Sequence, residues 1–313
     1  MNLLITGLHG FVGSNLTLAL KAKHTLYGLD IVSPQKDGVT KTYSWSDLEN
    51  KTLPEVDAII HLAGKAHDTK NCSEARVYFE INTELTKKIY DYFLTSSAKK
   101  FIFFSSVKSA ADTMIGDILT EDVVPAPQGP YGESKILAEK YLQANWPAVD
   151  SGKSVYILRP CMIHGPGNKG NLNLLYSFVH KGFPWPLGAF DNRRTYTSVD
   201  NLCFVVDGLV SGDVDPGIYH MADDEALSTN ELIGVMCEAM GRKAHIWRLP
   251  KGLMIGAAKL GGALHLSLNQ ERLRKLTESY VASNAKIKNE LGLERMPITA
   301  YEGLRRTILS FQK

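Results

Sequence analysis

The first thirty residues, MNLLITGLHGFVGSNLTLALKAKHTLYGLD (1–30), contain the pattern that decides the fold. The apolar residues 2–6 predict a β-strand, and the spacing Gly7-x-x-Gly10-x-x-Gly13 predicts a tight turn directly after it. A helical pattern follows the glycines, and a second strand-like run, HTLYGLD, ends at Asp30. Strand, glycine turn, helix and strand in this order are typical of a dinucleotide-binding unit.

Each part of this unit has a physical reason. Glycines let the backbone approach a pyrophosphate, and the N–H groups at the start of the helix stabilise its charge. We therefore predict cofactor contacts in the turn, at Gly7, Gly10, Phe11, Val12 and Gly13. An acidic residue at the end of the second strand binds ribose hydroxyls and repels a 2′-phosphate, so Asp30 favours NAD over NADP.

Further strands and helices alternate along the first half of the chain. Apolar runs predict strands within 56–64, 100–106 and 154–160, and helical patterns separate them at 74–96 and 132–145. Such alternation predicts an α/β fold with a doubly wound parallel sheet, the Rossmann architecture.

The second half of the chain has a different residue pattern. Residues 198–222 are expected to return to the sheet as a helix and a strand, and residues 223–313 to be mostly helical. We therefore expect a Rossmann domain made of 1–163 plus 198–222, which binds NAD. A smaller, mostly helical C-terminal substrate domain would comprise 164–197 plus 223–313.

Composition excludes several functional classes. The chain has 313 residues and a formal net charge of +2, which gives no electrostatic case for binding nucleic acid or an anionic membrane. Its four cysteines are far apart and form no CxxC pair, so we predict no zinc or other metal site and expect a reducing compartment, the cytoplasm. Residues 1–20 lack the pattern of a signal peptide. The apolar run 252–268 is interrupted by Lys259 and His265, which favours a packed, glycine-containing helix over a membrane span.

The stretch GPYGESK (129–135) carries the clearest catalytic signal. Tyr131 and Lys135 are four residues apart, so a helix would place them on one face. Free tyrosine has a pKa of about 10, and a nearby cation makes its phenolate more accessible. Each residue alone has an ordinary interpretation, as a half-buried aromatic ring or a solvated lysine. Their spacing directly after a proline favours an acid–base pair.

These motifs together resemble the extended short-chain dehydrogenase/reductase family, which includes sugar-nucleotide epimerases, dehydratases and reductases. The resemblance rests on the glycine turn, HLAG (61–64), FFSS (103–106) and PYGESK (130–135). It implies a catalytic triad of Ser106, Tyr131 and Lys135, with Ser105 as the alternative hydroxyl. It also implies cofactor contacts at Leu62, Ala63, Gly64, Asn82, Ser105, Tyr131 and Lys135. His61 and His67 are expected to be structural or exposed and not ligands.

The segments 164–173 and 181–202 resemble the substrate region of that family. The resemblance implies that Arg194 contacts a nucleotide phosphate. The alternative is that Arg193 and Arg194 are a pair of exposed surface residues. It implies substrate contacts for Asn171, with Asn173 as a further candidate for the diphosphate or uridine.

Two positions depart from the family pattern. His164 stands where the family usually has tyrosine, and we favour a tolerated replacement over a changed pocket. The C-terminal phosphate-contact motif is absent, and Arg272 or Arg274 is the candidate to replace it.

A finer resemblance, in HLAGKAHD and PLGAFDNRRTYTSVDN, is to a branch associated with bacterial surface polysaccharides. It implies a cytoplasmic, NAD-dependent 4-epimerase of a UDP-hexose or UDP-N-acetylhexosamine. The alternative is an NAD(P)H-dependent reductase, or C4 dehydrogenase, of a UDP-4-keto-6-deoxy sugar. A dehydratase is disfavoured because no carboxylate directly follows Ser106, and a regulator without activity would not need the triad. By the same resemblance we expect a homodimer formed through helices 74–96 and 132–145.

Overall fold

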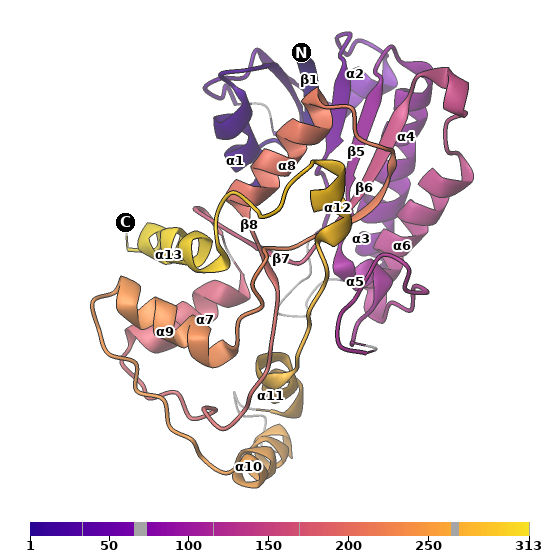
Figure 1. The fold of residues 1–313 in the computed structure, drawn as a ribbon. Coiled ribbons are helices and arrows are strands. Elements are labelled where there is room, and N and C mark those ends of the chain that lie inside the picture. Colours follow the sequence, from indigo (N-terminus) through magenta and orange to yellow (C-terminus); the bar gives the residue numbers. More distant parts are fainter. Residues whose placement is uncertain (33, 66–73, 115, 169, 264–268, 313) are drawn as a thin grey trace.

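The computed structural model describes residues 1–32, 34–65, 74–114, 116–168, 170–263 and 269–312 (Figure 1). Within them a seven-stranded sheet runs in the order β3-β2-β1-β4-β5-β6-β9, and every neighbouring pair is parallel. The strands are β1 (Asn2–Thr6), β2 (Thr25–Leu29), β3 (Lys41–Tyr43), β4 (Ala58–His61), β5 (Lys100–Phe104), β6 (Ser154–Pro160) and β9 (Gly217–Met221). The predicted parallel sheet is confirmed.

Both faces of the sheet are buried because alternate side chains point to opposite sides. In β1, Leu3 and Ile5 belong to the core beneath α1 (Phe11–Leu20) and α8 (Val199–Ser211). Leu4 belongs to the opposite core, which contains side chains of α4 (Leu85–Thr95) and α6 (Gly129–Ala144). Figure 1 shows these helices on the two sides of the sheet, which is therefore doubly wound.

The predicted helix over 74–96 is three consecutive segments, α3 (Ala75–Tyr78), the π-helix η1 (Phe79–Glu84) and α4. The helix predicted from residue 132 begins earlier, at Gly129, because Pro130 fits the first turn of a helix, where its missing N–H costs nothing. Short helical segments complete this part of the chain: α2 (Trp45–Glu49), α5 (Val107–Ala110) and the 3₁₀ turn η2 (Val149–Ser151).

The strand order reverses between β1 and β4, and this reversal positions the site. Thr6 pairs with Leu29 on one side and with His61 on the other, so β1, β2 and β4 end at the same level. Ligands of open α/β sheets bind outside the carboxyl ends of the strands at such a switch point. The segments that follow β1, β2, β4 and β5 therefore converge on one edge.

The remaining elements form a second part with its own core. A two-stranded sheet of β7 (Met162–His164) and β8 (Tyr196–Ser198) connects the two parts. The helices are α7 (Asn171–His180), α9 (Thr229–Ala239), α10 (Lys251–Ala263), α11 (Gln270–Thr277), α12 (Ala285–Glu290) and α13 (Ala300–Ser310). Trp185, Met236 and Leu304 belong to the second core.

α12 is an exception to the predicted division of the chain. Lys286 of α12 donates a hydrogen bond to the carbonyl oxygen of Ile218 in β9, at 3.0 Å, so this helix lies against the edge of the large sheet. The domain boundaries stay a prediction. α10 confirms the helix predicted in 252–268 as far as Ala263, and residues 264–268 lie outside the described part of the chain.

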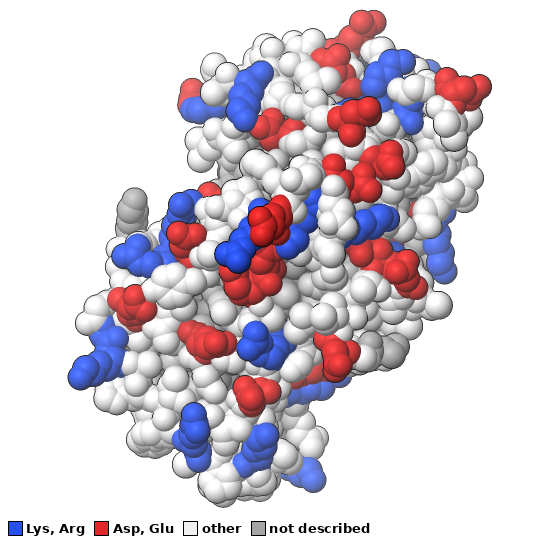
Figure 2. All heavy atoms as spheres, viewed as in Figure 1, with Lys and Arg blue, Asp and Glu red and all other residues white. Residues whose placement is uncertain are grey.

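Positive and negative side chains intermingle over most of the face shown in Figure 2. None of the helices among the described residues has the length and apolar character needed to cross a membrane.

Candidate active site

The glycine turn has the close packing that only glycine permits. Gly7 has a φ of +69°, and a Cβ there would lie 2.9 Å from the backbone nitrogen of Ala63. A Cβ on Gly13 would lie 2.5 Å from the carbonyl oxygen of Gly7, so α1 could not sit so close to the turn. The close approach of backbone atoms therefore explains why glycine is required at Gly7 and Gly13, two of the three predicted positions.

The third glycine tests whether the turn fits a dinucleotide. Gly10 is the N-cap of α1, and as a glycine it has no side chain that could bind the N–H groups of the helix start. No acidic side chain lies in the first turn. A Cβ on Gly10 would meet only the carbonyl oxygen of Gly7, at 3.2 Å, and no other atom within 4 Å. Phe11 and Val12 are half-buried beside it. The helix start therefore presents backbone N–H groups without an anionic competitor, as a pyrophosphate requires.

Asp30 lies directly after β2, as predicted, and a basic side chain lies close to it. Its carboxylate accepts hydrogen bonds from the backbone nitrogens of His9, at 2.9 Å, and Ile31, at 2.7 Å. Lys36 lies nearby and donates to the Leu8 carbonyl, at 2.9 Å, and to a side chain of α1. Burial lowers the pKa of Lys36, and the negative charge of Asp30 raises it. The sequence pattern pointed to the acid and missed this cation.

A chain of buried hydrogen bonds holds the segment after β4. The Nδ1 of His61 lies 2.7 Å from the Thr6 hydroxyl and its Nε2 lies 2.9 Å from the Thr86 hydroxyl. The Thr6 hydroxyl accepts from the backbone nitrogens of Leu62, at 3.2 Å, and Ala63, at 3.0 Å. Burial lowers the pKa of His61 to about 3, so its ring is neutral at physiological pH. His61 is structural, as predicted, whereas His67 lies outside the described residues.

Asn82 lies inside the π-helix η1, a type of helix that often marks functional sites. Its side chain accepts from the Lys65 backbone nitrogen, at 2.8 Å, and donates to the Ser134 hydroxyl, at 3.0 Å. It thereby joins the segment after β4 to the helix that carries Tyr131. Its role toward the cofactor stays a prediction.

The Lys135 ammonium group is buried in the middle of these elements. Its Nζ donates to the Phe104 carbonyl, at 2.8 Å, and lies 5.0 Å from the ring centre of Phe103. A Cβ on Gly64 would come within 3.2 Å of the same Nζ, so the missing side chain lets this segment lie close to the ammonium. Burial lowers the pKa of Lys135 to about 8, and the charge of Glu139 partly opposes this.

Ser106 and Tyr131 meet at the carboxyl end of β5. Ser106 caps α5 by accepting from the Lys108 backbone nitrogen, at 3.2 Å. Burial raises the pKa of Tyr131, and a side-chain hydrogen bond with Ser106 lowers it. The Tyr131 ring lies edge-on to Tyr78, 6.3 Å between ring centres. The structure thus brings the three predicted catalytic side chains to one edge of the sheet.

Ser105 differs from its neighbour. Its hydroxyl donates to Glu139, which also accepts from Ser109 and from Arg159, whose NH2 lies 2.6 Å from the carboxylate. Glu139 has no exposed surface and Arg159 has 2%. The hydroxyl of Ser105 is therefore occupied, which favours Ser106 over Ser105 as the candidate catalytic hydroxyl and weakens the prediction that the Ser105 side chain contacts the cofactor. The buried Glu139–Arg159 pair was not recognised from the sequence.

Positive charges gather on the substrate side of Ser106. Lys108 and Arg194 are close enough for Arg194 to lower the pKa of Lys108, which burial lowers further. Arg274 lies 3.7 Å from Asp112, which also pairs with Lys108. Arg194 is half-buried and donates to the Lys275 carbonyl, at 2.6 Å. Glu278 also lies in this region, 4.0 Å from Arg274, and its charge raises the pKa of Lys108, so three cations from separate segments lie here with two carboxylates.

The predicted asparagine contacts have different placements. Asn171 is the exposed first residue of α7. The side-chain oxygen of Asn173 accepts from the Gly170 backbone nitrogen, at 3.0 Å, and is used in capping that helix. The suggested substrate contact of Asn173 is therefore not supported by its geometry.

His164 is completely buried. Its Nδ1 lies 2.9 Å from the Thr307 hydroxyl and its Nε2 lies 3.5 Å from Asp223. It connects β7 to α13 and has a structural role, which agrees with a tolerated replacement. The backbone nitrogen of Arg272 donates to the Asn269 side chain, at 2.9 Å, in the N-cap of α11. The side chain of Arg274 lies 3.7 Å from Asp112.

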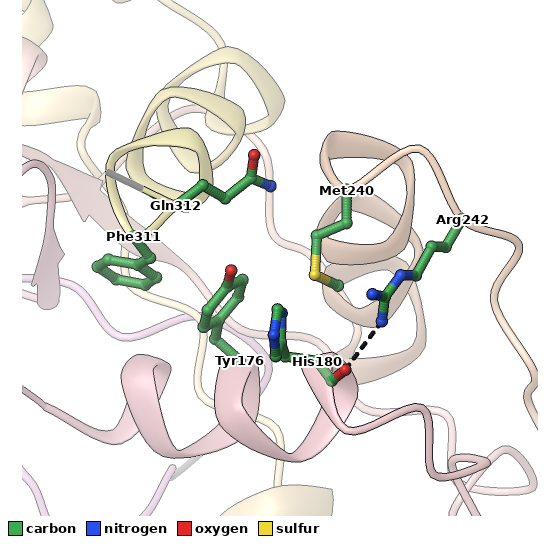
Figure 3. A pocket seen from close by; sticks show the side chains of 6 residues that line it. All are labelled: Tyr176, His180, Met240, Arg242, Phe311 and Gln312. Atoms are coloured by element: carbon green, nitrogen blue, oxygen red, sulfur yellow. Dashed lines mark hydrogen bonds between the residues drawn. The ribbon is translucent and has the colours of Figure 1, made fainter.

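A separate pocket of about 410 Å³ lies beside the ends of α7, α9 and α13 in the second part (Figure 3). It is lined by Tyr176, His180, Met240, Arg242, Phe311 and Gln312. Arg242 donates to the His180 carbonyl, at 2.8 Å. None of the predicted site residues lines it. Among the described residues no group of three or more His, Cys, Asp or Glu side chains could hold a metal ion.

A model of the NAD dependent epimerase/dehydratase family matches residues 3–220. The chain belongs to this family. A UDP-glucose 4-epimerase of Vibrio cholerae is 31% identical over 327 aligned residues, which cover 99% of this chain and 95% of the relative. An N-acetyl-alpha-D-glucosaminyl-diphospho-ditrans,octacis-undecaprenol 4-epimerase of Escherichia coli O157:H7 is 24% identical and covers 98% and 94%.

Solved structures agree with the fold. A UDP-glucuronic acid 4-epimerase from Bacillus cereus in complex with NAD superimposes with a TM-score of 0.75 at 18% identity, covering 100% of this chain and 99% of that one. The chain is thus an enzyme of an NAD-dependent family, and its glycine turn is the part that fits the cofactor.

Proposed function

We propose that this enzyme is an NAD-dependent 4-epimerase of a UDP-hexose or UDP-N-acetylhexosamine. The observation that carries the proposal is the meeting of Ser106, Tyr131 and Lys135 at the carboxyl edge of the sheet, beside Gly64 and the glycine turn. This placement puts an acid–base group and an ammonium on the side where Gly10 leaves room for a dinucleotide.

NAD⁺, when bound, supplies the hydride acceptor and a positively charged ring. Tyr131 then takes the proton of the sugar C4 hydroxyl at its phenolic oxygen, while Ser106 holds the same sugar oxygen by a hydrogen bond. In the described protein burial raises the pKa of Tyr131, so the phenol needs positive charge nearby to act as a base at neutral pH. After the sugar has turned, C4 would take the hydride back on its other face while Tyr131 returns the proton to that oxygen, and the opposite configuration results.

The surroundings of Ser106 argue against a dehydratase. Val107, Lys108 and Ser109 follow it directly and supply no carboxylate. Asp112, the next acid along the chain, is engaged by Lys108 at 3.2 Å. Elimination of water needs an additional acid–base pair, and this segment does not offer one.

A 4-keto-sugar reductase is the second candidate, and Lys36 is the observation that favours it. Its ammonium group lies beside Asp30 on the glycine turn, where it would offset the repulsion between that carboxylate and a 2′-phosphate. Among the relatives, a GDP-6-deoxy-D-mannose reductase of Pseudomonas aeruginosa is 26% identical and covers 75% of this chain. A reductase would consume NADH or NADPH, whereas an epimerase would not.

Activity without added reductant separates the two candidates. The protein saturated with NAD⁺ is incubated with UDP-glucose or UDP-N-acetylglucosamine, and the products are separated by chromatography. An epimerase yields the 4-epimer. Tyr131→Phe is expected to abolish turnover and retain nucleotide binding, and Tyr301→Phe, which removes an exposed hydroxyl bonded to Glu238, serves as the matched control.

The proposed contact of Arg194 with the substrate diphosphate has a control in the adjacent residue. Arg194→Ala is expected to raise KM by tenfold or more, because a charge-assisted contact to phosphate is worth roughly 1.5–3 kcal/mol. Arg193 is exposed, and Arg193→Ala is expected to leave KM unchanged. Equal effects of the two substitutions would contradict the assignment.

We further propose that the enzyme is a cytoplasmic homodimer that pairs through α4 and α6. Leu137 of α6 is 44% exposed, which supports an apolar contact on that helix. Cys161, Cys203 and Cys237 are free thiols, as expected in a reducing compartment. Leu137→Asp should convert a dimer into a monomer in sedimentation velocity experiments, and an unchanged sedimentation coefficient would contradict this interface.

A further inference from the structure

α10 exposes a continuous apolar stripe. Met254, Ala258 and Gly261 face the protein, and Met254 and Ala258 belong to the core of the second part together with Leu273 of α11. A second stripe, about 100° further round the helix, repeats at helical spacing and consists of Leu253, Gly256, Ala257 and Leu260. Leu253 is 59% exposed and Leu260 is 62% exposed. This stripe therefore stays uncovered by the described part of the chain.

The charged residues of the segment that contains this stripe are all positive. Residues 239–270 contain five basic side chains and no Asp or Glu, although the net charge of the whole chain is only +2. The basic residues are Arg242, Lys243, Arg248, Lys251 and Lys259, and all five are exposed. Figure 2 shows blue side chains and no red ones at the lowest end of this face, where Figure 1 places α10.

The acidic residues that flank this segment are already engaged. Glu238 accepts a hydrogen bond from the Tyr301 hydroxyl, and Glu271 pairs with Lys275 at 2.7 Å. The ion pair balances the charge of Glu271, whereas the hydroxyl leaves the charge of Glu238 in place at the start of the segment. Trp247, four residues before α10, is 55% exposed, and an exposed tryptophan next to basic residues is typical of a surface that contacts a bilayer interface.

We propose that α10 docks the enzyme onto an anionic lipid bilayer, with Leu253 and Leu260 in the headgroup boundary and Lys251 and Lys259 against lipid phosphates. A second copy of the chain is the less suitable occupant. A two-fold interface places the same surface on both subunits, so these basic residues would face one another. A helix that lies in the interface needs an apolar side and basic flanks, and α10 has both without having the length of a membrane span.

Vesicle flotation of the full-length protein tests this proposal directly. We expect the protein to float with vesicles of phosphatidylcholine and phosphatidylglycerol and not with vesicles of phosphatidylcholine alone. Added salt should weaken the binding, since charge contributes to it. Lys251→Gln and Lys259→Gln should each lower the partition coefficient by about fivefold.

The apolar contribution has a matched control. The double substitution Leu253→Ser and Leu260→Ser should lower the partition coefficient by at least about tenfold. Leu18→Ser changes a leucine of α1 that is 65% exposed, and it should have no effect. All variants should retain nucleotide binding, which shows that they are folded.

Three results would overturn the proposal. The protein could fail to bind either kind of vesicle at low salt. The double leucine variant could bind as well as the unchanged protein. The leucine substitutions could instead reduce the sedimenting mass without any vesicle binding by the parent protein, in which case the stripe is a contact between copies of the chain.

Discussion

Replacing Lys135 with methionine is expected to stabilise the protein while it removes activity. The side chain is 5% exposed, and burial lowers its pKa from 10.5 to about 8. Each pKa unit corresponds to ~1.4 kcal/mol, so the charged form costs the folded state about 3 kcal/mol at neutral pH. Methionine fills a similar volume without charge but leaves the Phe104 carbonyl without its donor, which costs about 1–2 kcal/mol. The net gain is therefore about 1–2 kcal/mol, or roughly 1.5–3 °C in Tm for a chain of 313 residues.

The pH dependence of this gain follows from the direction of the pKa change. The pKa of Lys135 is lower in the folded than in the unfolded protein, so its destabilising effect is complete below about pH 8. Between about pH 8 and 10.5 the unfolded chain binds more protons than the folded one, and the unmodified protein gains stability relative to the variant. The advantage of Lys135→Met should therefore shrink across this window.

Urea denaturation of the nucleotide-free protein from neutral pH to about pH 10 measures this difference. Lys140→Met, which changes an exposed lysine of the same helix, is the control and should show no such dependence. A Lys135→Met variant that is less stable at neutral pH, or that differs by the same free energy at every pH, would refute the reasoning.

Three further predictions concern neighbouring groups. Because the charge of Glu139 raises the pKa of Lys135, Glu139→Gln should move the alkaline limb of the kcat profile to lower pH, and an unmoved limb would show that the two groups are not coupled. A Cβ on Gly13 would lie 2.5 Å from a carbonyl oxygen of the turn, so Gly13→Ala should abolish NAD binding in calorimetry. Gly234→Ala, in a helix with no atom within 4 Å of the added Cβ, should retain NAD binding and gain up to ~1 kcal/mol of stability. Lys36→Met should weaken the binding of NADPH more than that of NADH in fluorescence titrations, and an equal loss for both would show that Lys36 does not face the 2′-phosphate.

Local patterns were sufficient to predict the large sheet and the cofactor turn. The strand predicted at 154–160 is β6 with the same bounds, because a long apolar run between polar segments has few alternatives. Short strands were missed. β3, β7 and β8 have three residues each, which is too few for a periodic pattern, and they are held in place by their partners.

Contacts between distant residues could not be predicted from spacing. The four-residue spacing correctly predicted that Tyr131 and Lys135 lie on one side of a helix. It did not predict that the Lys135 ammonium donates to the Phe104 carbonyl. Likewise, Ser105 and Ser106 are equivalent in the sequence. Only the approach of Glu139, 34 residues further along, separates the hydroxyl that is buried in an ion-pair network from the one that reaches Tyr131.

The fate of the hydrogen at C4 distinguishes an epimerase from a reductase. The NAD⁺-saturated enzyme is incubated with UDP-glucose and UDP-N-acetylglucosamine deuterated at C4, without any other reductant, and the products are analysed by NMR and mass spectrometry. An epimerase would return to C4 the same hydride that it removed, because no other reductant is present, so we expect a 4-epimer that keeps its deuterium at C4. Recovery of both substrates unchanged, together with oxidation of added NADH or NADPH by a 4-keto sugar, would contradict it and identify a reductase.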